Sequence, residues 1–451
     1  LPYPTLAVPH PRYTPPSLYP TLAMPSDVHR AIETVWRIES PRLIGGLVRI
    51  VRDVGLAEDL AQDALLAALE QWPEAGLPRN PGAWLMSTAR RRAVDHFRHR
   101  GMAQEKHEQL GREADDNQPD RADVLVDAID DDIGDDLLRL LFISCHPVLS
   151  VEARVALTLR LLGGLSTPEI ARAFLVPEAT IAQRIVRAKR TLAEARVPYE
   201  VPRGVDRAAR VSSVLNVIYL IFNEGYSATA GDDWLRPALC EDAMRLGRIL
   251  ATLAPDNAEV HGLVALMEIQ ASRARARVGP EGDPILLLDQ DRSRWDRLLI
   301  RRGLDALAKA EAIGGSLGPF ALQAAIAACH ARALRPQDTD WHRIVALYDA
   351  LGELTPSPII ELNRAVAISM AEGPAAGLDL VDELLGEPAL QNYHLLPAVR
   401  GDLLAKLGRS DEARAEFERA AFMTQNTRER KLLLARAAAD TGGRGRPAAD
   451  L

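Results

Sequence analysis

The chain is poor in cysteine and has no long apolar run. Three of its 451 residues are cysteines, Cys145, Cys240 and Cys329, and no two of them form a CxxC pair. Neither a disulfide framework nor a zinc site is therefore indicated, which suits a reducing compartment. No apolar run approaches the ~18 residues that a membrane span needs. We expect a cytoplasmic protein without metal or cofactor.

The start of the chain also lacks the charged and apolar regions of a signal peptide. Residues 1–25 are rich in proline and tyrosine, and we expect a disordered tail there. Alanine, leucine and arginine dominate the rest, and these residues favour helix over strand. Because 451 residues exceed one ordinary core, the sequence predicts an all-α protein of several domains.

The net charge of −8 at first disfavours a nucleic-acid partner. The basic residues, however, gather in two short stretches, 90–100 and 184–196, and most of the excess acid lies between them. Local basic faces decide phosphate binding more than the charge of the whole chain. We therefore expect two basic surfaces joined by an acidic linker over 101–135.

Residues 26–100 read as a helical bundle. The segment 57–72 puts alanines and leucines on one face, and Pro73 is expected to end that helix. Asn80 then fits the N-cap of a helix over 81–100, with Trp84 facing inward and arginines outward. An aromatic ring beside cations suits separated nucleic-acid strands, but a core tryptophan with solvated arginines explains the same pattern.

Residues 136–197 contain a stronger local signal, a helix-turn-helix over 165–192. Ser166 and Glu169 fit a capping box for the first helix, and Pro177 opens the second. The second helix has an apolar stripe formed by Ile181, Ile185, Ala188 and Leu192. The side chains off that stripe would face bases and phosphates, although an ordinary helical hairpin remains possible. They are Glu178, Thr180, Gln183, Arg184, Arg187 and Arg190.

Residues 205–440 read as paired amphipathic helices. The stretches 361–384 and 396–419 align with an offset of 35 residues, close to the tetratricopeptide period of about 34. The number of earlier repeats stays open. Such a solenoid suits a protein partner or an intramolecular one.

The order of these segments resembles the extracytoplasmic-function group of sigma-70 RNA polymerase sigma factors. DVGLAEDLAQDALLAALEQW (53–72) and NPGAWLMSTARRRAVDHFR (80–98) resemble the polymerase-binding and promoter-melting helices of sigma region 2. Residues 136–197 resemble region 4, and no counterpart of region 3 or region 1.1 is found. Several later segments resemble the tetratricopeptide-like extension of one sigma-factor subfamily; they are IFNEGYSATAG (221–231), LLLDQDRSRWD (286–296), GPFALQAAIAACHA (318–331) and TPSPIIELNRAVAISMAEGPAAG (355–377).

The resemblance implies a protein that is not itself an enzyme and gives promoter specificity to core RNA polymerase. It implies core-polymerase contacts at the exposed polar positions of the first helix, Glu58, Asp59, Gln62 and Asp63. It implies contacts with the −10 element at Asn80, Trp84, Arg90 and Arg91, the arginines chiefly to phosphates. The second helix of region 4 would read the −35 element.

Three features leave other interpretations open. Asn223-Glu224-Gly225-Tyr226 has an acid beside an apolar helix, but we expect Gly225 to supply a C-cap and Glu224 and Tyr226 to make a regulatory contact. The Cys-His pairs at 145–146 and 329–330, and the acidic residues in 279–296, are expected to be structural rather than metal sites. A stand-alone helix-turn-helix regulator with a repeat sensor domain is the alternative function, and it would need region 4 but not region 2.

Overall fold

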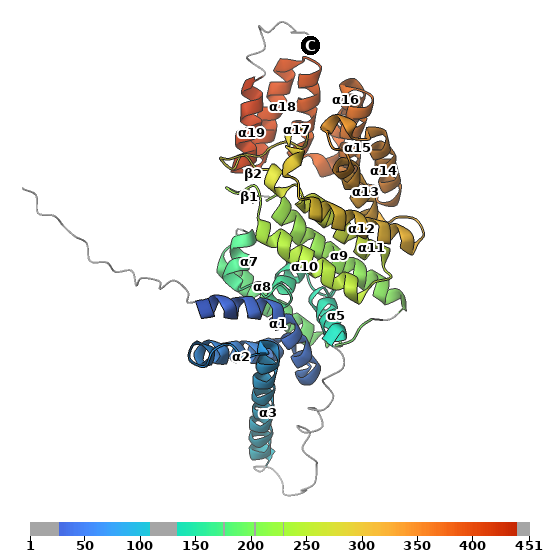
Figure 1. Cartoon of the computed structure of the whole chain (residues 1–451). Coiled ribbons are helices and arrows are strands. Elements are labelled where there is room, and N and C mark those ends of the chain that lie inside the picture. The colour runs from blue at the N-terminus through green and yellow to red at the C-terminus, as the bar shows by residue number, and fades with distance from the viewer. Residues whose placement is uncertain (1–26, 109–132, 175, 203, 229, 440–451) are drawn as a thin grey trace, which may run out of the picture.

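The computed structural model describes residues 27–108, 133–174, 176–202, 204–228 and 230–439. Within these ranges the protein is built almost entirely from helices, as the sequence predicts (Figure 1). The predicted tail and most of the predicted acidic linker lie outside the described residues. The first part of the chain forms α1 (Asp27–Val51), α2 (Val54–Ala75) and α3 (Pro81–Glu108).

Helix α2 packs against α1 and α3 and forms the centre of this first bundle. It begins at the N-cap Asp53, whose side chain accepts a hydrogen bond of 2.8 Å from the backbone N–H of Leu56. Its predicted apolar face is buried, and Trp72 is only 2% exposed. The prediction that Pro73 ends the helix is wrong. Proline in the last turn removes only one hydrogen bond, so the helix continues to Ala75 and stops at Gly76, where φ is +81°.

The second part of the chain packs against the first. Its helices are α5 (Ile133–Ser144), α6 (Val151–Leu161), α7 (Thr167–Phe174) and α8 (Glu178–Glu194). Helix α3 is longer than the predicted 81–100 and takes in eight residues of the predicted linker 101–135, while α5 takes in the last three linker residues.

The third part is a stack of helices above α5–α8 in Figure 1. They are α9 (Gly204–Tyr226), α10 (Pro237–Leu253), α11 (Ala258–Ala271), α12 (Arg297–Ile313), α13 (Pro319–Arg332), α14 (Trp341–Leu354), α15 (Pro358–Ala371), α16 (Pro374–Glu383), α17 (Leu395–Lys406), α18 (Ser410–Met423) and α19 (Thr427–Ala439). The two aligned stretches correspond to the helix pairs α15–α16 and α17–α18. A helical-pair architecture is therefore present, while its membership of the tetratricopeptide class stays a prediction.

Two short strands close the third part. Strands β1 (Ala230–Gly231) and β2 (Gln425–Asn426) pair in parallel. The side-chain amide of Asn426 donates to the carbonyl oxygens of Ala228 at 3.0 Å and Asp233 at 2.9 Å. Asn426 is fully buried, and its hydrogen bonds join the segment before α19 to the loop that follows α9.

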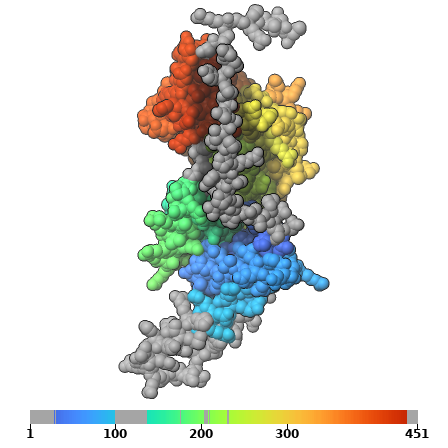
Figure 2. Space-filling view, turned by 90° about the vertical axis from the view of Figure 1, so that its left-hand side faces the viewer, coloured from blue at the N-terminus to red at the C-terminus, as the bar shows by residue number. Residues whose placement is uncertain are grey.

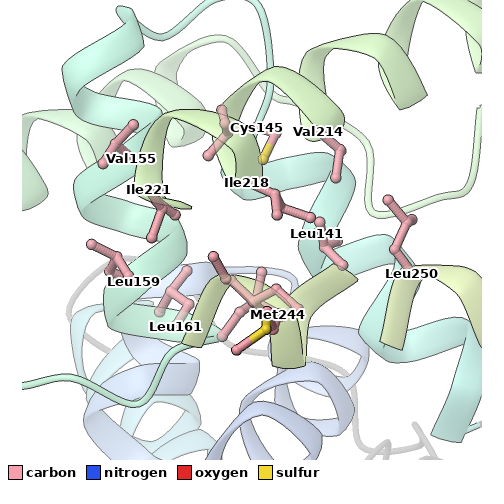
Figure 3. Packing of buried hydrophobic residues seen from close by; sticks show 14 of the residues in the cluster. Leu141, Cys145, Val155, Leu159, Leu161, Val214, Ile218, Ile221, Met244 and Leu250 are labelled. Carbon is pink, nitrogen blue, oxygen red and sulfur yellow. The ribbon is translucent and has the colours of Figure 1, made fainter. Parts of the chain in front are cut away.

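One apolar core runs through all three parts. Figure 3 shows Ile218 and Ile221 of α9 packed among Leu141 of α5 and Leu159 of α6, with Met244 of α10 nearby. The same cluster continues into α1 and α2. In Figure 2 the blue and green parts accordingly lie against each other. The C-terminal domain thus shares an apolar core with the preceding domain and packs directly against it.

Candidate polymerase and nucleic-acid interface

Helix α8 has the amphipathic form that the sequence predicts. Ile181, Ile185, Ala188 and Leu192 are its buried residues. Of the six predicted DNA-facing side chains, Thr180 and Arg184 are half-buried and the others are exposed. Arg190 forms an exposed ion pair of 2.6 Å with Glu194, one turn later. The polar face of α8 is therefore largely accessible, and its charge is mostly positive.

Helix α7 begins with the predicted capping box. The Ser166 backbone N–H donates to Glu169 Oε2 at 2.7 Å, and the Glu169 backbone N–H donates to Ser166 Oγ at 3.4 Å. Arg37 of α1 donates to the other oxygen of Glu169 at 3.0 Å. Burial acts to raise the pKa of Glu169, but hydrogen bonds from Ser166 and the charge of Arg37 lower it below its usual value. The start of the helix-turn-helix is thus tied to the first bundle.

Glu58 is not an exposed polar residue of α2, and that prediction is wrong. Its residue exposure is 3%. Its Oε1 accepts from Arg160 Nε of α6 at 2.6 Å, and its Oε2 lies 2.6 Å from Lys189 Nζ of α8. Gln62 also donates to Oε1, at 2.7 Å. Glu58 therefore joins the first bundle to α6 and α8 of the second part.

The charges around Glu58 keep its carboxylate ionised. Burial acts to raise its pKa, but the positive charges and hydrogen bonds of Lys189 and Arg160 outweigh burial and lower the pKa below its usual value. Neither cation was assigned a site role from the sequence. The spacing in the sequence does indicate that Glu58 is buried. Glu58 lies one turn after Val54 and one turn before Ala61, so it continues an apolar stripe.

The other predicted polymerase contacts of α2 differ in accessibility. Asp59 is exposed, while Gln62 and Asp63 are half-buried. Asp63 lies 3.4 Å from Arg92 of α3 in an ion pair. A cavity of about 660 Å³ lies beside this helix, lined by Gln62, Leu65, Leu66 and residues of α1, and on the other side by residues of the second part. One flank of α2 therefore faces the second part.

The predicted −10 residues lie along the first half of α3. Asn80 is the N-cap, accepting a hydrogen bond of 3.1 Å from the backbone N–H of Ala83. Trp84 is half-buried and contacts Trp72 edge to face, with 5.3 Å between ring centroids. Arg90 is half-buried, and Arg91 is exposed and donates to the carbonyl oxygen of Ser87. Trp84 is therefore partly accessible, and Arg91 lies two helical turns after it with an exposed guanidinium.

The segment around Glu224 makes the contact between the third part and α7, but Gly225 is not a C-cap. Helix α9 continues to Tyr226, and a Cβ on Gly225 would lie 2.7 Å from the backbone nitrogen of Cys240. Glycine here permits the close approach of α9 and α10. Glu224 pairs with Arg236, which also donates to the carbonyl oxygen of Ala173 in α7. Tyr226 instead faces inward, stacked on Phe222 with 5.5 Å between ring centroids.

Among the described residues no group of three or more His, Cys, Asp or Glu side chains could hold a metal ion. Cys145 lies 3.4 Å from Thr158 Oγ1 in the apolar core, and burial raises its pKa to about 11. In the part of the chain that the structure describes, no helix is long and apolar enough to cross a membrane.

Comparison with known families matches this arrangement segment by segment. Residues 36–102 match sigma-70 region 2, and residues 139–192 match sigma-70 region 4. The ECF RNA polymerase sigma factor SigK of Mycobacterium sp. (strain KMS) is 30% identical over 148 residues, which are 32% of this chain and 72% of SigK. The chain belongs to the ECF sigma factors. It therefore directs promoter recognition in transcription initiation, and its family binds core RNA polymerase and promoter DNA.

Other relatives extend the comparison. The probable ECF sigma factor SigI of Mycobacterium tuberculosis (strain CDC 1551 / Oshkosh) is 27% identical over 169 residues, 38% of this chain and 57% of SigI. An uncharacterized protein of Rhizobium meliloti, R00370, is 46% identical over 390 residues, 86% of this chain and 91% of its own length. Residues 210–311 match a family of unknown function, DUF6596. No solved structure gave a significant match.

These matches decide between the functions left open by the sequence. A stand-alone helix-turn-helix regulator has no need of region 2, which is matched here over its polymerase-binding and promoter-melting helices. Sigma-factor families are generally not enzymes. The R00370 match covers the third part as well, so the whole three-part organisation occurs in a second protein.

Proposed function

We propose that the free protein holds regions 2 and 4 together in a closed arrangement, and that the two regions separate when core polymerase and promoter DNA bind. The observation that carries this proposal is the burial of Glu58 between Arg160 and Lys189. Arg37 and Glu169 add a second, more exposed ion pair between the same regions.

Promoter geometry supports the proposal. The −10 and −35 elements lie about 25 base pairs apart, which at about 3.4 Å per base pair is roughly 85 Å of DNA. Lys189 of the −35-reading helix lies 2.6 Å from Glu58 of α2, and α2 packs directly against the −10-reading helix α3. Both reading surfaces therefore lie within one compact body, and they cannot reach the two elements at once unless region 4 moves away.

The proposed roles in polymerase and DNA contact are limited to side chains that are at least partly accessible. We propose that Asp59, Gln62 and Asp63 contact core polymerase, and that Glu58 acts instead on region 4. Asn80, Trp84, Arg90 and Arg91 are proposed to meet the −10 element. On α8 the proposed −35-reading residues are Glu178, Thr180, Gln183, Arg184, Arg187 and Arg190.

The C-terminal domain is proposed to bias this equilibrium. Arg236 links Glu224 of α9 to the end of α7, and Arg245 of α10 donates to the carbonyl oxygens of Leu162 and Gly163, both at 3.0 Å. These contacts join the C-terminal domain to α7 and to the turn that precedes it. A partner or ligand that altered the C-terminal domain would therefore act on region 4 directly.

The experiment compares Glu58→Gln with the matched control Glu70→Gln, an exposed position on the same helix. Core-polymerase affinity and transcription from a cognate promoter are measured for each. If only an open fraction binds, releasing Glu58 raises the apparent affinity, by tenfold for every 1.4 kcal/mol lost from the closed form. A fall in affinity for Glu58→Gln alone would make Glu58 a polymerase contact and defeat the closed arrangement.

A further inference from the structure

A cavity of about 310 Å³ lies inside the C-terminal domain, away from the proposed polymerase and DNA surfaces. Its walls come from α9, α11, α13, α14 and α15, with Arg273 and Leu287 from the segment between α11 and α12. All four C-terminal segments whose sequences resemble the subfamily extension contribute to it, through Asn223, Leu287, His330 and Asn363 among others. Segments spread over about 140 residues thus converge on one space.

Part of the cavity lining is aromatic. Tyr219, Phe222, Tyr226 and Tyr348 all line it. The Tyr219 ring meets Phe320 edge to face, and its hydroxyl donates to Gln323 Oε1 at 3.0 Å, so this ring is held in place. Preformed aromatic and aliphatic walls with a few fixed polar groups are the usual lining of a small-molecule site.

A buried guanidinium also lines the cavity. Arg273 is 8% exposed, and its Nε is buried without a hydrogen-bond partner. Its guanidinium lies 5.9 Å from the Tyr226 ring centroid and 5.8 Å from that of Trp295. Among the described residues it has no carboxylate partner within ion-pair distance. A buried charge without a counter-charge is costly, so its persistence requires an explanation.

The neighbouring arginines do not relieve this charge. Arg277 donates to the carbonyl oxygen of Tyr226, and Arg292 donates to those of His330 and Ala333, so both are engaged with the backbone. Both are also buried, which leaves the region with an excess of positive charge. Arg273 is the arginine that both lines the cavity and lacks a hydrogen-bonded side-chain partner within the residues that the structure describes.

Two further polar atoms at the cavity are unpartnered. Gln270 Oε1 and His330 Nδ1 are both buried without a hydrogen-bond partner, and both residues line the space. Burial and the charges of Arg273 and Arg292 lower the pKa of His330 to about 3, so the imidazole is neutral near pH 7. Each unmet polar group in a buried space calls for a ligand or ordered water.

We propose that this cavity binds a small aromatic monocarboxylate, with the carboxylate on Arg273 and the ring among Tyr219, Phe222 and Tyr348. One available guanidinium matches one negative charge, and the planar fork of arginine suits a carboxylate. The volume equals that of about ten water molecules, which fits a ligand of roughly ten non-hydrogen atoms. Binding itself does not depend on the closed arrangement, although Asn223 in the cavity wall directly precedes Glu224, which reaches region 4 through Arg236.

The test is isothermal titration calorimetry of the full chain with phenylacetate, and with phenylacetamide as the neutral probe of the same shape. We expect one phenylacetate per chain and at least tenfold weaker binding of the amide, because a charge-assisted hydrogen bond is lost. Arg273→Gln should remove this discrimination. The matched control Arg275→Gln, an exposed arginine two residues away and outside the cavity lining, should keep it.

The melting temperature of Arg273→Gln and the binding of a second variant distinguish a ligand site from a purely structural arginine. Arg273→Gln removes an unpaired buried charge, so its melting temperature should be equal to or above that of the unchanged protein, whereas a purely structural arginine would show a loss. Ala327→Leu adds volume at the cavity wall and should block phenylacetate while every charge remains. Absence of one-to-one binding, equal affinity for the amide, or unchanged binding by both variants would each overturn the proposal and leave a water-filled cavity. None of these outcomes bears on whether regions 2 and 4 close on each other.

Discussion

The carboxylate of Glu58 in α2 lies 2.6 Å from the ammonium nitrogen of Lys189 in α8, two residues 131 positions apart. Lys189 adjoins the proposed DNA-reading face of its helix, and Glu58 adjoins the proposed polymerase-reading face of its own. One buried ion pair therefore connects the two surfaces through which a sigma factor works.

Charge reversal at Asp59 should weaken core-polymerase binding. Asp59 is exposed and Gln62 beside it is half-buried, so Asp59→Arg alone tests the face without disturbing the Glu58 cluster. We expect a loss of at least tenfold in affinity with no change in melting temperature. Glu418→Arg, an exposed reversal in α18, is the control. Equal affinities for Asp59→Arg and the control would remove the polymerase contact from this face.

The −35 face of α8 should separate into base and phosphate contacts. Alanine at a base contact should cost about 1–3 kcal/mol and relax preference at one base pair. Alanine at a phosphate contact should weaken all promoters alike and lower the salt slope by about one. Gln183, Arg184 and Arg187 are changed singly and binding to promoter variants is measured at several salt concentrations. A triple variant that transcribes every cognate promoter as well as the unchanged protein would contradict the assignment of α8.

The closed arrangement should loosen in acid. The pKa of folded Glu58 is lowered from the usual value of 4.5, so its contribution is fully present above pH 4.5 and is lost as pH falls through the lowered value. The groups that face it are Arg160, Lys189 and Gln62. The stability difference between the unchanged protein and Glu58→Gln, measured by urea denaturation, should be about 1–3 kcal/mol at pH 7 and should shrink below pH 4.5. A difference that stays constant down to pH 3 would contradict the ionised cluster.

Removal of the C-terminal domain should destabilise region 4. Ile218 and Ile221 of α9 pack on α5 and α6, so a chain that ends near Pro198 leaves an apolar surface exposed. We expect a lower melting temperature and aggregation. A more local test of how the C-terminal domain acts on region 4 is Arg245→Ala, which removes the hydrogen bonds to the Leu162 and Gly163 carbonyl oxygens. The matched control is Arg301→Ala at an exposed position. Normal stability of the truncated chain would show that region 4 has a complete core of its own.

The sequence predicted the local structure of the helix-turn-helix because that structure depends on neighbours in the chain. The buried stripe of α8 and the Ser166–Glu169 capping box both follow from a helical period and a local hydrogen bond. Glu58 was misassigned because its partners, Arg160 and Lys189, are over 100 positions away, and polar residues are usually placed outside. The C-cap prediction for Gly225 is wrong because that residue, too, is constrained by a different helix. Its requirement is the close approach of Cys240, which the local sequence does not record.

The distance between α2 and α8, measured with and without core polymerase, tests the closed arrangement most directly. Fluorescent labels are attached to Glu70→Cys and Ala193→Cys, both exposed positions. The three native cysteines are buried, and burial raises the pKa of Cys145 to about 11 and that of Cys240 to about 12. The closed arrangement predicts efficient energy transfer in the free protein, and a large loss of transfer when core polymerase and promoter DNA bind. Transfer that is low in the free protein, or unchanged in a transcriptionally active complex, would contradict it.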